Sequence, residues 1–203
     1  TSFGIQSAVL LNALHEQNKG SEIPVIWIDT GYLPVETYTY AEELKNLLNL
    51  NLHVIQSKIS PARMEAIYGK LWESDSIKEV DKYHLIRKVE PLEEAFLDLK
   101  IKCWASGVRG EQTNHRKSMT VIDPIRNRLS LRPLLSWTKK DIFYYMEEKK
   151  LPQHPLFEKG YSTVGDWHSS GPDNGEESGR DTRFGGKKQE CGIHTAGLHG
   201  DGI

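Results

Sequence analysis

The sequence predicts an α/β fold with an open, mostly parallel, twisted sheet that is flanked by helices. Residues 23–28 are a continuous apolar run followed by a turn sequence at 29–31, which is typical of a buried parallel strand. Apolar residues recur with helical spacing before this strand, over 5–14, and after it, over 35–49. A second short strand is expected at 52–55. Helices and strands that alternate over short links favour right-handed crossovers and therefore a parallel sheet.

The rest of the chain is expected to continue this alternation. We expect helices over 61–73, 91–99 and 139–149, a strand over 101–106, and two shorter strands around a turn at Asn127. Thr138 is the expected N-cap of the last helix. Because a helical pattern begins almost at residue 1, we also expect that a first strand precedes this chain in a longer protein.

The composition changes after Gly165, and the sequence predicts one folded domain over 1–165 and a mobile tail over 166–203. The second segment holds nine of the 17 glycines and few aliphatic residues. Such a segment buries too little apolar surface to fold as a domain of its own.

The composition also argues against several classes of protein. With 26 basic and 28 acidic residues the net charge is −2, which excludes a globally basic nucleic-acid-binding protein. No apolar run approaches the roughly 18 residues that a membrane span needs. The two cysteines, Cys103 and Cys191, are too few for a disulfide scaffold and lack metal-binding spacing, so we expect a reducing, cytoplasmic location.

The two cysteines differ in their surroundings. Cys191 lies in a charged, glycine-rich stretch with Lys187 and Lys188, and nearby cations make a thiol easier to ionise and attract anionic substrates. An exposed thiol is an oxidation liability unless it is used, so Cys191 is the candidate nucleophile. Cys103 lies in an apolar, strand-like sequence, and we expect it to be buried and inert.

Three segments follow predicted strands, at the edge where a parallel sheet binds its ligands. Thr1-Ser2-Phe3-Gly4 stands where a strand would meet a helix, and its small residues would let an anion approach the helix N-terminus. Asp29 and Thr30 end the next strand, and Gly107 and Arg109 end a later one. The alternative interpretation is an ordinary helix cap or turn for the first two segments and a surface salt bridge for Arg109.

Four further cations are candidates for binding an anion. Arg87 and Lys88 come shortly before Pro91, which is expected in the first turn of a helix, so their charges would meet a positive dipole end. That arrangement favours an anionic ligand and is otherwise unhelpful to stability. Arg180 and Arg183 stand three residues apart in the tail. The alternative interpretation is that all four are solvated surface charges.

Taken together, these residues resemble the assimilatory phosphoadenylyl-sulfate (PAPS) reductases. The resemblance runs from residue 1 to about residue 194, and the closing motif, which contains Cys191, is the most specific. The matching motifs are, in chain order, Asp29-Thr30-Gly31-Tyr32, Tyr68-Gly69-Lys70-Leu71-Trp72-Glu73, Lys88-Val89-Glu90-Pro91, Gly107-x-Arg109, Gly160-Tyr161-x-x-x-Gly165-Asp166 and Glu190-Cys191-Gly192-Ile193-His194.

The resemblance implies the fold of the adenine nucleotide α-hydrolase-like proteins, with a modified pyrophosphate loop. Thr1-Ser2-Phe3-Gly4 corresponds to that loop and departs from the Ser-Gly-Gly-x-Asp-Ser form of the relatives that cleave ATP. The missing Asp implies nucleotide binding without metal-assisted ATP cleavage.

The resemblance also implies a reaction and its participants. The Cys191 thiolate would attack the sulfonate sulfur of PAPS, and reduced thioredoxin or glutaredoxin would then release sulfite from the Cys191 S-sulfonate. The cations of the site would neutralise the phosphosulfate, His194 would assist the thiol, and the protein would be a homodimer. The implied substrate-binding residues are Thr1, Ser2, Phe3, Gly4, Asp29, Thr30, Lys88, Gly107, Arg109, Arg180, Arg183 and His194.

The resemblance implies PAPS as the substrate, because a cofactor of the related adenylyl-sulfate (APS) reductases cannot form here. Those enzymes hold a [4Fe–4S] cluster on two pairs of cysteines. Tyr83 and His84 stand at one pair of positions, and Asp166 and Ser169 stand at the other. Four thiolates are needed and these positions supply none, so no bound cofactor is expected.

Other functions remain open from the sequence. The chain could be a cluster-free APS reductase, an ATP-dependent ligase or adenylyltransferase on the same sheet, or a nucleotide-binding regulator without catalysis. Arg116 and Lys117 are the candidates for binding the 3′-phosphate that distinguishes PAPS from APS.

Overall fold

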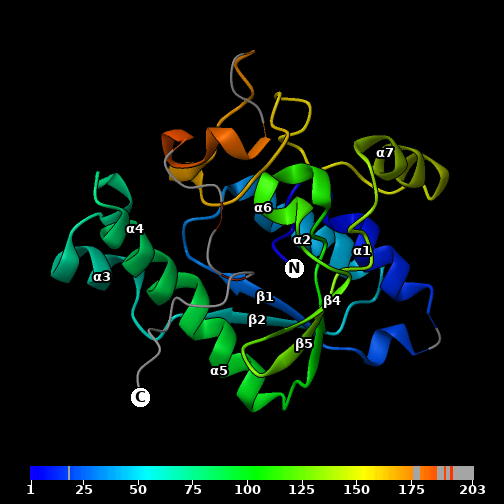
Figure 1. Cartoon of the computed structure of the whole chain (residues 1–203), viewed down its shortest axis with the longest axis horizontal. Coiled ribbons are helices and arrows are strands. Elements are labelled where there is room, and N and C mark those ends of the chain that lie inside the picture. Colours follow the sequence, from blue (N-terminus) through cyan, green and yellow to red (C-terminus); the bar gives the residue numbers. More distant parts are fainter. Residues whose placement is uncertain (18, 176–178, 187–189, 191–192, 194–203) are drawn as a thin grey trace.

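Strands lie in the middle of the molecule with helices around them (Figure 1). The structure is a computed structural model that describes residues 1–17, 19–175, 179–186, 190 and 193. It has the predicted α/β architecture, and its hydrogen-bonded strands form a two-stranded and a three-stranded ladder.

The first ladder is the predicted parallel unit. β1 (Val25–Asp29) pairs in parallel with β2 (Leu52–Gln56), and the register places Asp29 opposite Gln56. The helix α2 (Val35–Leu47) connects the two strands. Because both strands run in the same direction, the turn after β1 lies at one edge of the sheet, where the site residues are expected.

The second ladder contains the other predicted strands in the order β3-β5-β4. β3 (Cys103–Ala105) is parallel to β5 (Arg128–Leu131), whereas β4 (Ile122–Ile125) is antiparallel to β5. Arg126 and Asn127 form the two-residue hairpin turn between β4 and β5, with φ values of 54° and 58°. Two successive left-handed residues are the requirement of a type I′ turn, which suits the twist of a hairpin.

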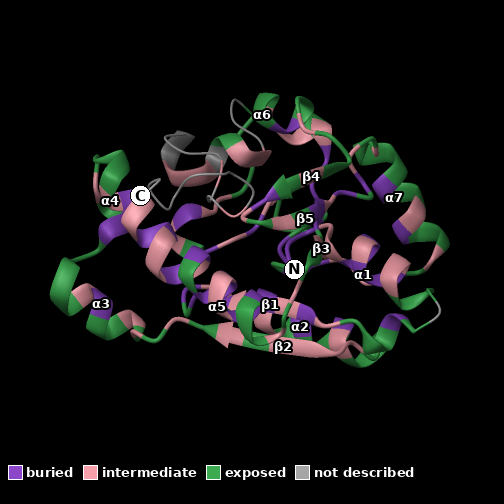
Figure 2. Cartoon of the chain, turned by 60° about the horizontal axis from the view of Figure 1, so that its bottom comes forward, coloured by how far each residue is buried: buried purple, intermediate pink, exposed green. Residues whose placement is uncertain are grey.

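The main hydrophobic core lies between β1 and three helices, α1 (Ser7–His15), α2 and α7 (Lys139–Glu148). Figure 2 shows buried residues on β1 and on parts of these helices, whereas β2 is only partly buried. α7 begins where the sequence predicts, because Thr138 and Asp141 form a capping box. The buried apolar residues of this core include Phe3, Trp27, Tyr40, Leu44, Ile142 and Met146.

The predicted helix over 61–73 is shorter than expected. α3 (Pro61–Tyr68) begins after the Ser60 cap and ends at Gly69, whose φ of 73° is not helical. A separate 3₁₀ turn, η2 (Leu71–Glu73), follows. The glycine therefore divides a segment whose apolar spacing alone predicted one helix.

The prediction that a helix begins at Pro91 is wrong. α4 (Ile77–His84) continues through a π-helical turn, η3 (Leu85–Val89), into α5 (Glu90–Asp98). Pro91 lacks an N–H and cannot make a regular helical hydrogen bond, and the helix accommodates it next to a widened turn instead of ending. Lys88 therefore lies within a helix and not before a helix N-terminus.

The folded part extends beyond the expected boundary at residue 165. Asp166 and Ser169 are buried, and two short 3₁₀ helices follow Gly165. No helix in the described part of the chain is long and apolar enough to cross a bilayer. The remaining short helices are η1 (Gly20–Glu22), η4 (Gly110–Gln112), α6 (Asn114–Lys117), η5 (Trp167–Ser169) and η6 (Gly179–Gly186).

Candidate active site

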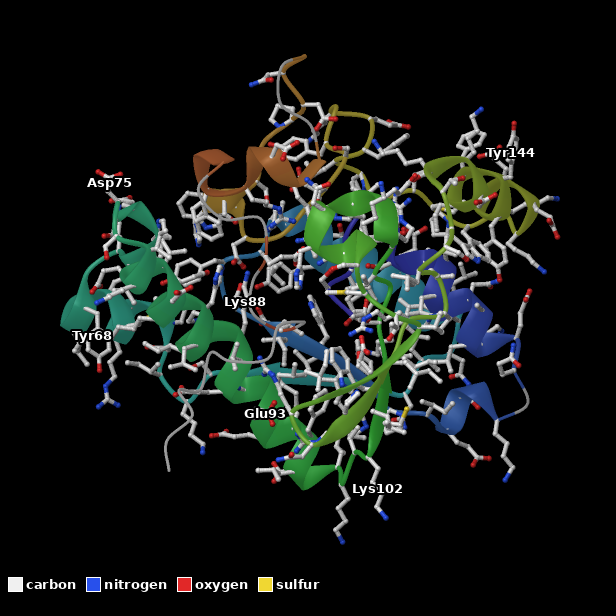
Figure 3. All side chains as sticks on the ribbon, viewed as in Figure 1. Tyr68, Asp75, Lys88, Glu93, Lys102 and Tyr144 are labelled. Carbon is white, nitrogen blue, oxygen red and sulfur yellow. The ribbon has the colours of Figure 1, made fainter. Side chains whose placement is uncertain are left out.

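A buried ion pair connects the end of β1 to the α4–α5 helix. The Asp166 carboxylate lies 2.5 Å from Lys88 Nζ, and its other oxygen accepts a 2.5 Å hydrogen bond from Thr30 Oγ1. Burial alone would raise the pKa of the Asp166 carboxyl, but Lys88 and the hydrogen bond from Thr30 hold it well below its usual range. Asp166 is fully buried, whereas the Lys88 side chain keeps 12% of its exposure. Lys88 lies on the side of its helix that faces the middle of the molecule (Figure 3).

The Arg87 side chain binds backbone carbonyl oxygens. Its Nε donates to Thr30 O at 2.9 Å and its Nη1 to Ile59 O at 2.5 Å, and the side chain is 2% exposed. A buried guanidinium that binds carbonyl oxygens ties the turn after β1 to the helix. Arg87 therefore has a structural role, and Lys88 is the remaining candidate of the two adjacent cations for binding a ligand.

Asp29 also has a structural role. Its carboxylate accepts hydrogen bonds from Tyr38 Oη at 2.6 Å, Gln56 Nε2 at 2.7 Å and Gly31 N at 2.9 Å. These bonds fix the turn that places Thr30. The sequence signal at Asp29-Thr30 thus marks one residue that shapes the turn and one that binds Asp166.

The segment Thr1-Ser2-Phe3-Gly4 lies beside the same edge. The Phe3 side chain is buried against Trp27, with ring centroids 5.0 Å apart, so only its backbone could contact a ligand. A Cβ at Gly4 would stand 3.3 Å from Val164 O, which shows how closely the segment approaches the chain before Gly165. α1 follows with no side-chain cap on its first turn, and such a helix N-terminus can donate N–H groups to an anion.

Arg183 reaches the same place from η6. Its Nη2 donates to Thr163 Oγ1 at 3.0 Å, and its guanidinium lies so close to Gly165 that a side chain there would overlap it. Phe184 packs at 5.2 Å from the His84 ring and fixes η6 on the α4–α5 helix. The structure therefore brings Arg183, Lys88 and Thr30 into one neighbourhood around Gly165 and Asp166.

Arg109 lies at the start of α1. Its guanidinium donates to Glu111 Oε1 and to Gln6 Oε1, each at 2.5 Å, and the side chain is 4% exposed. Gln6 is the residue that precedes α1, so Arg109 fixes the entry of that helix. Gly107 is exposed beside it, at the end of β3, where the sequence expectation placed it.

A second ionic group lies on α6. Arg116 forms a bidentate ion pair with Glu190, and Arg180 Nη1 lies 3.8 Å from the same carboxylate. η6, which carries Arg180, lies beside α6 in Figures 1 and 2. A cavity of about 560 Å³ borders this group, and its lining residues are Gly110, Glu111, Gln112, Thr113, Asn114, Lys117 and Asp181.

Two histidines lie against the buried ion pair. His84 is 1% exposed, and neither ring nitrogen has a hydrogen-bond partner among the described residues. His168 stacks on Trp72 at 4.4 Å, and its Nε2 lies 3.0 Å from Tyr83 Oη. Burial lowers the pKa of His84 to about 3 and that of His168 to about 4, and the nearby cations Lys88 and Arg183 add to this effect. Both rings are therefore neutral at physiological pH.

We predict that the free energy of unfolding falls as the pH is lowered from 6.5 toward 4. Burial also lowers the pKa of His154 to about 4, so three histidines resist protonation in the fold while the unfolded chain takes up protons near 6.5. Each histidine can contribute a slope of up to ~1.4 kcal/mol per pH unit. Below pH 3.8 the unfolded chain also takes up a proton on the Asp166 carboxyl, which the fold keeps ionised, so further stability is lost.

Urea unfolding at several pH values measures this slope. His84→Phe removes one titrating group without breaking a described hydrogen bond, so it should flatten the curve. An unchanged free energy of unfolding between pH 7 and pH 4.5 would contradict the assignment.

The predictions for the two cysteines have different outcomes. The expectation that Cys103 is buried is wrong: it is exposed, because β3 is the outer strand of its ladder and alternate side chains face opposite sides. Cys191 and His194 lie outside the described residues, so their positions stay predictions.

Within the described part, no three His, Cys, Asp or Glu residues gather as a metal site would require. The positions compared with cluster cysteines do lie together, since Tyr83 contacts His168 and His84 borders the Lys88–Asp166 pair. No pattern in the sequence predicts that ion pair or the Arg116–Glu190 pair. For the Lys88–Asp166 pair, the sequence gives one signal, which is that the charged residue Asp166 directly follows Gly165 in a motif.

The fold and the site define an α/β protein that gathers cations and an uncapped helix N-terminus at one edge of a parallel sheet. Residues 1–172 match the family model of the phosphoadenosine phosphosulfate reductase domain. A reductase of that name from Synechococcus sp. is 54% identical over 195 residues, which cover 96% of this chain and 83% of that protein. The chain therefore belongs to the phosphoadenosine phosphosulfate reductase family.

Solved structures agree with this assignment. The PAPS reductase of Candida auris, a phosphate complex, has a TM-score of 0.71 and 26% identity, and covers 84% of this chain and 81% of its own. The FMN adenylyltransferase of Candida glabrata shares the fold alone, with a TM-score of 0.55, 15% identity, and coverage of 74% of this chain and 43% of its own.

Proposed function

We propose that the protein reduces 3′-phosphoadenylyl sulfate to sulfite and adenosine 3′,5′-bisphosphate, with electrons from thioredoxin or glutaredoxin. The observation that supports this most is the meeting of Lys88, Arg183 and the start of α1 around Gly165. Fixed positive charge of this kind suits a ligand that carries phosphate and sulfate groups. The family assignment supplies the chemical identity of that ligand.

The proposed reaction has two displacements. The Cys191 sulfur attacks the sulfonate sulfur, the bond from that sulfur to the phosphate oxygen breaks, and the electron pair leaves on adenosine 3′,5′-bisphosphate. One thiol of reduced thioredoxin then attacks Cys191 Sγ and expels sulfite, and the second thiol completes the disulfide. The dithiol supplies both electrons, so no bound cofactor or iron–sulfur cluster is required.

The charges of the site have a defined task in this scheme. An anionic thiolate must approach an anionic sulfonate, and cations reduce that repulsion and stabilise charge on the leaving phosphate. Lys88 and Arg183 are the described candidates for binding the phosphosulfate, and Arg109, which binds Gln6, and Arg180, which lies near Glu190, are further cations of the proposed site. We assign His194 to the thiol, and Thr1, Ser2, Gly4 and Gly107 to the nucleotide. Asp29 and Phe3 act by shaping that edge.

Steady-state kinetics test the proposal against its alternatives. With reduced thioredoxin we expect sulfite from PAPS at a kcat/KM at least about tenfold above that from APS, as recognition of an added phosphate should give. A preference for APS would identify a cluster-free APS reductase. Consumption of ATP would identify an adenylyltransferase, and nucleotide binding without sulfite would identify a regulator.

We predict that Arg183→Ala lowers kcat/KM for PAPS by at least about tenfold, because a hydrogen bond from a charged group is worth about 1.5–3 kcal/mol. The free energy of unfolding should change by less than ~1 kcal/mol, since the side chain is only half-buried and lies outside the hydrophobic core. Kinetics and urea unfolding of the same preparation separate the two effects. An unchanged kcat/KM would remove Arg183 from the site.

Location and assembly remain part of the proposal. A thiol nucleophile that is restored by thioredoxin suits the cytoplasm, where thiols are kept reduced. We also propose a homodimer, which light scattering of the purified protein would test.

A further inference from the structure

One carboxylate of the described structure is held by donors from three directions. Glu190 Oε1 accepts hydrogen bonds from Arg116 Nε at 2.7 Å and Thr113 Oγ1 at 3.1 Å. Glu190 Oε2 accepts from Arg116 Nη2 at 2.8 Å and lies 3.8 Å from Arg180 Nη1. Two parallel bonds from one guanidinium fix the orientation of a carboxylate as well as its distance.

The residues that bind the Glu190 carboxylate are themselves held in place by hydrogen bonds and burial. Arg116 is 2% exposed, and its third nitrogen, Nη1, donates to Gln112 Oε1 at 2.5 Å. Thr113 caps α6 by accepting a 3.1 Å hydrogen bond from the backbone N–H of Arg116. Gln112, Thr113 and Arg116 belong to one turn of the chain. The Arg116 guanidinium is therefore fixed whether or not the Glu190 carboxylate is bound.

Burial distinguishes this pair from the surface ion pairs of the same protein. The Glu190 side chain keeps 15% of its exposure, whereas Lys58 and Glu94 keep 83% and 45%. Exposed pairs contribute little, whereas removing one partner of a desolvated pair leaves an uncompensated charge. The Arg116–Glu190 contact is therefore strong enough to hold Glu190 on α6.

Glu190 immediately precedes Cys191 in the sequence, and consecutive Cα atoms lie about 3.8 Å apart. We propose that Glu190 is a positioning residue: Arg116 and Thr113 hold its carboxylate and so limit the distance of the adjacent thiol from the bound nucleotide. This inference rests on the proposed function of Cys191. It assigns Arg116 to the chain's own carboxylate, not to the 3′-phosphate of the substrate.

A single-turnover experiment tests the anchor. The full chain is mixed with PAPS without reductant, and the Cys191 S-sulfonate is followed by intact mass. We expect Glu190→Gln to slow adduct formation by about 10- to 100-fold, the range that misplacement of a reacting group produces. The affinity for adenosine 3′,5′-bisphosphate, measured by calorimetry, should stay within about twofold, because the nucleotide does not contact Glu190 in this scheme. Glu147→Gln makes the same chemical change at an exposed position of α7 and should leave both values unchanged.

Two further variants show whether Glu190 acts through Arg116. Arg116→Gln should slow adduct formation as Glu190→Gln does, and the double variant should be no slower than either single variant, since all three lack the same contact. Glu190→Asp keeps the charge and should recover part of the rate. Thermal unfolding of each variant detects any that fail to fold, and the conservative Glu190→Asp then carries the comparison.

Each outcome bears on a different claim. A wild-type rate in Glu190→Gln, with the adduct formed, would overturn the anchor and leave the proposed function standing. A normal rate with tighter nucleotide binding would show that Glu190 competes with substrate for Arg116, which also overturns it. Additive losses in the double variant would mean that the two residues act separately. Absence of any adduct in the unmodified protein would instead overturn the proposed function.

Discussion

Cys191→Ser is expected to abolish both the S-sulfonate adduct and sulfite release. A serine hydroxyl is not ionised at neutral pH, whereas a thiol beside cations supplies a thiolate. The residual rate should be at least about 10³-fold lower, as for other enzymes that lose a nucleophile. Binding of adenosine 3′,5′-bisphosphate should persist, because the groups around Gly165 that are assigned to the nucleotide remain in place.

Cys103→Ser provides the matched control, since it makes the same atomic change at the second thiol. Cys103 is exposed on the outer strand of its ladder, and that ladder is not hydrogen-bonded to β1, which precedes Thr30. Its variant should retain activity within about twofold. Sulfite production by Cys191→Ser, or a large loss in Cys103→Ser, would show that the nucleophile is misassigned.

Asp166→Asn is expected to lower the free energy of unfolding by about 3–5 kcal/mol, because it leaves the Lys88 ammonium without its charge partner in a buried site. The carboxylate is fully buried and binds Lys88 and Thr30 at 2.5 Å each, so water cannot replace it without rearrangement. The same change should lower activity, since Lys88 would no longer be held at the sheet edge.

Glu42→Gln is the control for this second effect. It breaks an exposed pair with Lys45, whose side chain keeps 42% of its exposure, and should cost less than ~1 kcal/mol. Urea unfolding measures both variants. An Asp166→Asn protein as stable as the Glu42→Gln protein would contradict the view that this pair holds the β1 turn to the α4–α5 helix.

Much of the fold could be predicted because it depends on local patterns. The apolar run before Asp29 and the helical spacing around it define a strand between two helices, and the structure confirms both. The helix at 77–90 was missed because Pro91 suggested a beginning, and only tertiary packing shows that the chain passes through a π turn instead. The exposure of Cys103 depends on which strand lies at the edge, which no local pattern reveals.

The candidate site also contains some residues that could be predicted from the sequence and others that could not. Lys88 could be selected because it lies in a motif and Arg183 because it is one of two arginines close together in the tail, and the structure brings both to the neighbourhood of Gly165. Their partners could not be predicted, since Thr30 and Asp166 are 136 residues apart and Arg116 and Glu190 are 74 apart. Long-range ion pairs leave no periodicity in the sequence, so only the folded arrangement identifies them.

The central claim is that a sulfur atom of this chain accepts the sulfonate group of a nucleotide held by fixed positive charge. The most direct measurement is the intact mass of the protein after mixing with PAPS in the absence of reductant, followed by peptide mapping. A gain of about 80 Da on Cys191, lost again on addition of reduced thioredoxin, is the predicted result. An unchanged mass while adenosine 3′,5′-bisphosphate is released, or the same gain on Cys103, would contradict the account.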